Sequence, residues 1–285
     1  MSARLGLVVF LVAVVLSAAF LFSFLSGGGE ADEVEVYVGV SFCGNTSAEA
    51  RLLVDRVKDY TNLFVVLSGP VSYNEAALTE VCDYAVGAGL SVIVFFGDLN
   101  ERVLELKGLE WRLQWIEMAR ERWGNKFLGV YYYDEPGGIY IDYEWNSSML
   151  YPRNITLNDL TYDMIAEFYV RLFQLEGGLK FLKDYGVTSF VSDYALYWFD
   201  YLAGYDVVLA QVGWNHTFAQ DIALVRGAAR LQNKSWGIIV TWKYMHPPYL
   251  DEAENIYWQM VEAYRCGAKY IVIFNYAEDM SGAYG

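Results

Sequence analysis

The stretch "FLGVYYYDEPGG", residues 127–138, joins a continuous apolar run to an acid pair and a glycine-rich turn. Residues 127–133 show no alternation of apolar and polar side chains, which is typical of a strand buried on both faces of a parallel sheet. Asp134 and Glu135 follow directly, although a charge is costly to bury. We therefore expect the acid pair to lie where a buried strand ends and its sheet opens to solvent.

Seven further runs of this kind occur along the chain. They cover residues 34–42, 62–69, 90–97, 187–193, 206–213, 236–242 and 269–276. Between the eight runs lie segments with apolar residues at three- and four-residue spacing, which is typical of amphipathic helices. These segments cover residues 47–60, 74–89, 110–124, 161–186, 218–233 and 252–267. Eight buried strands that alternate with helices predict a closed (β/α)8 barrel, the TIM barrel, and 285 residues are enough for one such domain.

The competing architecture is an open, doubly wound sheet. Such sheets commonly carry Gly-x-Gly-x-x-Gly after the first strand, whereas this chain has "GVSFCGNTS" at 39–47. The barrel is therefore favoured. Its fourth connection, residues 134–186, is far longer than usual, and we expect it to cover the mouth of the barrel.

The end of the sequence is unusual for a barrel. Gly285 follows shortly after the eighth run, so no eighth helix is predicted. Either the sequence is a fragment, or another element covers the seam between strands eight and one. A protein partner at this seam is one such element.

The first residues of the chain form a long apolar segment. Residues 5–25 are 21 uncharged and mainly apolar residues, preceded by Arg4 and followed by Gly27, Gly28 and Gly29. This length spans a bilayer, and the single basic residue predicts a cytoplasmic N-terminus. We therefore predict a signal anchor and joint at 1–29, and a barrel domain at 30–285 held at the cell surface. A cleaved signal peptide is the alternative.

The predicted export agrees with the pattern of possible N-glycosylation sites. Five Asn-x-Ser/Thr sites begin at Asn45, Asn146, Asn154, Asn215 and Asn233, which favours a glycoprotein, although chance produces such matches. The three cysteines are an odd number with wide spacing. Neither a disulfide framework nor a zinc site is predicted.

Charge and motifs exclude several classes of partner and chemistry. The net charge is −15, with 20 Lys and Arg against 35 Asp and Glu, so the chain repels the phosphates of nucleic acids. The only two histidines are His216 and His246, and no Gly-x-Ser-x-Gly, phosphate-loop or His-Glu-x-x-His motif occurs. We predict neither a metal nor a cofactor. Aromatic residues make up 17% of the chain, which supplies both a core and a cleft able to hold a sugar.

The motif "YYYDEP", residues 131–136, resembles the (β/α)8-barrel glycoside hydrolases, many of which carry their acid/base Glu at the end of the fourth strand. The resemblance extends over the barrel, but this motif alone is specific. It implies that Glu135 is the proton donor. Asp134 matches the partner that, in the hexosaminidase-like branch, orients the acetamido group of the substrate as nucleophile. The alternative is a plain turn, in which Asp134 bonds its own backbone and Glu135 is solvated.

The chain departs from the family at the seventh strand. The major retaining clan carries its nucleophile Glu there, whereas "IIVTWKYMHPP" at 238–248 has no carboxylate. Asp193, after the fifth strand, is the favoured second carboxylate, and Asp98, Glu278 and Asp279 are alternatives. Polar and aromatic side chains at other strand ends are predicted to bind sugar. They are Tyr133, Gln211, Trp214, Trp242, Tyr244 and Asn275.

Two functions fit these features. The first is an exported, membrane-anchored glycoside hydrolase that cleaves a neutral or amino-sugar glycan by carboxylate acid/base catalysis. The second is a cell-surface protein that keeps the barrel but binds carbohydrate, or builds a surface layer, without turnover.

Overall fold

The structure is a computed structural model that describes residues 35–97, 99–144, 156–213, 217–241 and 251–275. Residues 36–285 form one compact unit. Its eight parallel strands close into a barrel in which each strand pairs with the next and β8 pairs with β1. The strands are β1 (Tyr37–Phe42), β2 (Leu63–Val66), β3 (Ser91–Phe95), β4 (Phe127–Tyr131), β5 (Ser189–Asp193), β6 (Val207–Val212), β7 (Ser235–Val240) and β8 (Tyr270–Asn275). The predicted barrel is confirmed.

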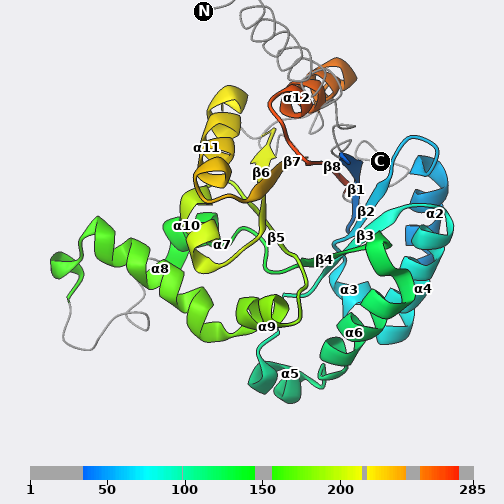
Figure 1. Cartoon of the computed structure of the whole chain (residues 1–285), viewed down its shortest axis with the longest axis horizontal. Helices are drawn as coiled ribbons and strands as arrows, with labels where there is room; N and C mark the ends of the chain where they lie inside the picture. The colour runs from blue at the N-terminus through cyan, green and yellow to red at the C-terminus, as the bar shows by residue number, and fades with distance from the viewer. Residues whose placement is uncertain (1–34, 98, 145–155, 214–216, 242–250, 276–285) are drawn as a thin grey trace, which may run out of the picture. The chain divides into compact units, whose positions relative to one another are not determined.

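Helices surround the ring of strands (Figure 1). They are α2 (Ser47–Val57), α3 (Gly69–Ser72), α4 (Glu75–Gly87), α5 (Glu101–Lys107), α6 (Trp111–Trp123), α7 (Pro136–Ile139), α8 (Tyr162–Glu176), α9 (Gly178–Asp184), α10 (Tyr197–Ala203), α11 (Phe218–Leu231) and α12 (Ala253–Arg265). The single helix expected over 161–186 is two helices, because Gly177 adopts a left-handed φ of 93° between them. Helix α10 and the short helices α3, α5 and α7 were not predicted.

Alternate residues of each strand face the inside of the barrel, and the others face the helices. The inner core includes Leu63, Val65 and Tyr131, whereas Phe64 and Val66 belong to the outer core. At Gly39 of β1 a side chain would not fit, because a Cβ there would stand 1.9 Å from the carbonyl oxygen of Leu63 on β2. This alternation decides which strand-end residues reach the mouth of the barrel.

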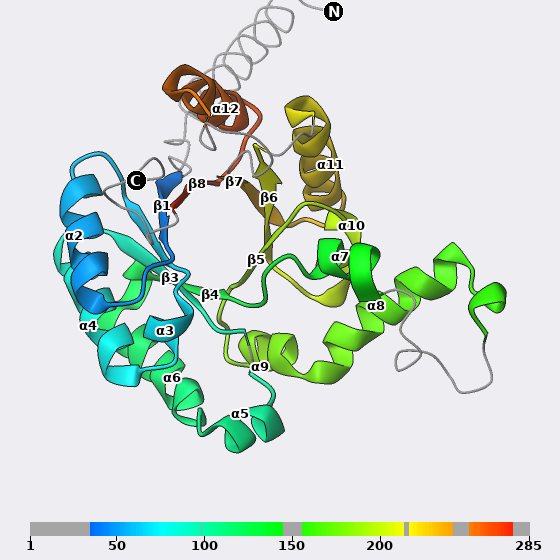
Figure 2. The ribbon, with the colours of Figure 1, turned by 180° about the vertical axis from the view of Figure 1, so that it is seen from behind.

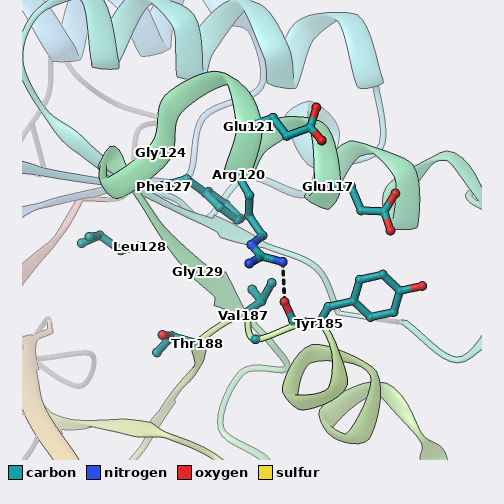
Figure 3. Close-up of a pocket in the computed structure, with 11 residues that line it drawn as sticks. Glu117, Arg120, Glu121, Gly124, Phe127, Leu128, Gly129, Tyr185, Val187 and Thr188 are labelled. Atoms are coloured by element: carbon teal, nitrogen blue, oxygen red, sulfur yellow. Dashed lines mark hydrogen bonds between the residues drawn. The ribbon is translucent and has the colours of Figure 1, made fainter.

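Strands β4 and β5 are joined more sparsely than the other neighbours. Only Val130 with Ser189 and Tyr131 with Phe190 are paired in register, whereas β6 and β7 share six such pairs. At the N-terminal end of this seam lies a cavity of about 770 Å³. Figure 3 shows Arg120 of α6 reaching into it, with Nη1 2.5 Å from the carbonyl oxygen of Tyr185.

The predicted localisation is corrected by the helices of the structure. Within the ranges described above, no helix is long and apolar enough to cross a membrane, so the cell-surface placement through a transmembrane helix is wrong. The apolar stretch at 5–25 itself lies outside the described residues.

Candidate active site

The acid pair follows β4 in a backbone that turns twice through left-handed conformations. Tyr133 has a φ of 60° and Glu135 a φ of 53°, which side chains other than glycine seldom adopt. Strand β4 ends at Tyr131, two residues earlier than expected, and Pro136 begins α7. The backbone N–H of Glu135 donates to the carbonyl of Ser192 on β5, at 2.9 Å. The pair therefore lies at the C-terminal end of the strands, where active sites of this fold are found.

The Glu135 carboxylate is held from β6. Its Oε1 accepts a hydrogen bond from Nε2 of Gln211 at 2.7 Å, and the same nitrogen lies 3.0 Å from Oγ of Ser192. Gln211 is only 4% exposed, so its amide is a fixed donor rather than a mobile surface group. This contact orients Glu135 across the ends of β5 and β6.

The Asp134 carboxylate accepts a hydrogen bond from Tyr131, the last residue of β4. The Tyr131 hydroxyl, inside the barrel, donates to Oδ1 of Asp134. Burial raises the pKa of Asp134 to about 7, the Tyr131 hydrogen bond lowers it, and the charge of Glu135 raises it. Asp134 is nevertheless exposed to solvent, so water screens its charge and moderates the rise of its pKa. Two carboxyl groups side by side at the end of a barrel strand are an arrangement that acid/base catalysis uses.

One hydrogen-bond network joins the two acids. Ser192 also bonds the Tyr131 hydroxyl. The contacts therefore run from Asp134 through Tyr131, Ser192 and Gln211 to Glu135. Each member comes from the inward-facing side of its strand or from the end of β4, so a perturbation of one side chain reaches the others.

Asp193 lies behind the pair, on the helix-facing side of β5. Neighbouring Ser192 faces inward, and strand alternation turns Asp193 outward. Its carboxylate is fully buried and accepts backbone N–H groups of Gly137, Gly138 and two further residues. Burial raises the pKa of Asp193 to about 7, while these four bonds lower it.

Of the remaining predicted site residues, the structure describes Tyr133 and Asn275. The Tyr133 hydroxyl donates to Oε1 of Glu176 at 2.9 Å, and its ring packs against Phe173 of α8, so Tyr133 lies outside the network. Asn275 is the last residue of β8 and pairs with Phe42 of β1. Trp214, Trp242, Tyr244, Asp98, Glu278 and Asp279 lie outside the described residues.

Sequence reasoning missed three residues at this end of the barrel. Tyr131 and Ser192 are inward-facing and carry the network, and counting back by twos from the strand end would have found them. Cys43 follows β1, and burial raises the pKa of its thiol to about 12, while its Ser41 hydrogen bond lowers it and the charge of Asp134 raises it. No cluster of three His, Cys, Asp or Glu able to hold a metal occurs among the described residues.

Comparison with known proteins supports the fold alone. No protein family and no curated protein matches the sequence. An endo-β-1,4-mannanase from Thermotoga petrophila is 6% identical, with 85% of this chain and 68% of that chain covered and a TM-score of 0.53. The cellulose synthase subunit Z of Clostridioides difficile is 13% identical, with 88% and 94% covered and a TM-score of 0.49. The D-psicose 3-epimerase of Clostridium cellulolyticum H10 is 12% identical, with 84% of each chain covered and a TM-score of 0.46. Identities this low do not transfer an activity.

Proposed function

We propose that the chain is a (β/α)8-barrel glycoside hydrolase that acts on a neutral or amino-sugar glycan, with Glu135 as proton donor and Asp134 as its partner. The observation that carries the proposal is the acid pair at the end of β4, joined through a continuous network to β5 and β6. Such a pair supplies the proton and the anion that cleavage of a glycosidic bond requires.

The chemistry is simplest with an N-acetylated sugar. Glu135 gives its proton to the glycosidic oxygen as the bond from this oxygen to the anomeric carbon breaks. The acetamido oxygen of the sugar forms the new bond to that carbon, and the Asp134 carboxylate accepts a hydrogen bond from the acetamido N–H. Water then attacks the anomeric carbon, the bond to the acetamido oxygen breaks, and Glu135 takes up a proton from the water.

Two features favour a substrate that brings its own nucleophile. Asp193, the favoured second carboxylate, has its oxygens occupied by backbone amides on the outer side of β5. Residues 238–248, where the retaining clan carries its nucleophile, contain no Asp or Glu. The same absence favours the alternative function, a barrel that binds glycan without turnover.

A screen of chromogenic glycosides tests the proposal. We expect hydrolysis of 4-nitrophenyl N-acetylhexosaminides to exceed that of the matching sugars without the acetamido group. Glu135→Gln should lower turnover by about 10² to 10⁴, the usual contribution of a general acid. The matched control is Glu121→Gln, on α6 beside the cavity of Figure 3, which should leave turnover unchanged. Full activity in Glu135→Gln would contradict the proposed role, and glycan binding without any turnover would favour the alternative.

A further inference from the structure

Four backbone amides, two from α7 and two from the segment after β5, converge on the buried carboxylate of Asp193. Gly137 and Gly138 of α7 donate to Oδ2 and Oδ1 at 2.5 and 2.9 Å. Tyr194 and Ala195, which follow β5, donate to Oδ1 at 2.8 and 3.1 Å. A carboxylate that accepts this many amides is a fixed structural joint, since an isolated buried charge is costly.

The two glycines are matched to this joint. A Cβ on Gly137 would stand 2.8 Å from Oδ2 of Asp193, and one on Gly138 would stand 2.0 Å from the ring of Tyr194. The sequence Pro-Gly-Gly after the acid pair is therefore required by close packing against β5. Figure 2 shows α7 beside α10 and the end of β5, where this contact is made.

Gly137 is two residues from Glu135, whose own backbone is left-handed and strained. On one side, the Glu135 N–H bonds the carbonyl of Ser192, and on the other, Asp193 holds the next two amides of α7. We propose that Asp193 is a positioning residue, which keeps Glu135 in this conformation and aims its carboxylate at Gln211 and the barrel mouth. Its catalytic consequence rests on the proposed function, whereas the joint itself does not.

Among the residues that the structure describes, no cationic side chain contributes to the pKa of Asp193. Asp200 and Tyr197 of α10 and Tyr169 of α8 face it, together with Tyr205. All of these groups are acidic or neutral. The backbone amides are therefore the groups that favour the charged form of Asp193, which burial disfavours.

The change Asp193→Asn distinguishes the hydrogen bond at Oδ2 from the three hydrogen bonds at Oδ1. Asn keeps one acceptor oxygen, which suffices for the amides at Oδ1, but places an N–H₂ group against the N–H of Gly137. We expect hydrogen exchange at the amide of Gly137 to become at least about 10-fold faster. The matched control is Asp200→Asn, which removes a buried carboxyl of α10 that accepts from Tyr169, and should leave exchange at Gly137 unchanged. Wild-type exchange at Gly137 in Asp193→Asn would overturn the proposal.

Kinetics test the positioning role. We expect Asp193→Asn to lower kcat by about 10- to 100-fold with KM changed by less than about threefold, because a small misplacement of a catalytic group acts on the chemical step. An unchanged kcat beside faster exchange overturns the positioning of Glu135. If the wild-type chain shows no hydrolase activity, the proposed function is wrong. The contacts of Asp193 with α7 are then tested by the exchange rates alone.

A second variant covers the case in which Asp193→Asn fails to fold. Gly137→Ala leaves Asp193 intact and forces the first turn of α7 away from Oδ2. The same acceleration of exchange at position 138 and the same fall in kcat are expected. Wild-type exchange and turnover in this variant would overturn the proposal.

Discussion

Replacing Asp193 by Asn is expected to change how the stability of the barrel depends on pH. In the folded chain the pKa of Asp193 is raised to about 7 from its ordinary value of 3.8, chiefly by burial. The folded state therefore binds a proton more tightly than the unfolded state. The resulting stability is fully present below about pH 4 and is lost as the pH rises through about 7.

The size of this effect follows from the two pKa values. The difference between about 7 and 3.8 corresponds to about 4 kcal/mol, at about 1.4 kcal/mol per pH unit. Asn has no proton to lose in this range. Between about pH 4 and about pH 8, wild type should therefore lose up to about 4 kcal/mol of unfolding free energy relative to Asp193→Asn.

Urea unfolding followed by tryptophan fluorescence measures this difference. The free energies of unfolding of both proteins are compared at about pH 4, 5.5, 7 and 8, with equal slopes against urea as the check on two-state behaviour. Asp134 is common to both proteins and largely cancels, whereas the charge of Asp193 raises the pKa of Asp200, so the comparison is repeated with Asp200→Asn in both proteins. A wild type that instead gains stability over the variant as the pH rises would show that the four amides outweigh burial.

Two further predictions concern neighbouring contacts. Gly138→Ala should destabilise the barrel by about 1–3 kcal/mol, because its Cβ would meet the ring of Tyr194, whereas Gly87→Ala in open space on α4 should stabilise it by about 0.5–1 kcal/mol; thermal unfolding distinguishes the two signs. Tyr131→Phe removes the hydroxyl that lowers the pKa of Asp134, so this pKa should rise relative to wild type, and an unchanged carboxyl titration by ¹³C NMR would contradict the assigned contact.

The barrel was predictable because its strands carry a simple signal. Runs such as 206–213 are apolar without alternation, as expected of strands covered on both faces, and β6 occupies Val207–Val212 within it. Helix α10 was missed because buried Asp200 interrupts its apolar face and five of its seven residues are aromatic or acidic. Its aromatic residues therefore gave no helical period.

The site was predictable only as far as the strand ends determine it. Asp134 and Glu135 were assigned to the end of β4 because an apolar run stops there. The placement of Asp193 depends instead on whether the last residue of β5 faces inward or outward. It also depends on contacts with Gly137 and Gly138, more than fifty residues away in the sequence. Single-sequence patterns record neither of these facts.

The sparse pairing of β4 with β5 has a consequence for how this protein can acquire new activities. Only two residue pairs close the sheet there, and the loop that carries Glu135 adds its own bond to β5 immediately above them. The segment that carries Glu135 therefore also helps to join β4 to β5. Substitutions that remodel this loop would also open the ring of strands, so change at this position should require compensating mutations along the β4–β5 seam.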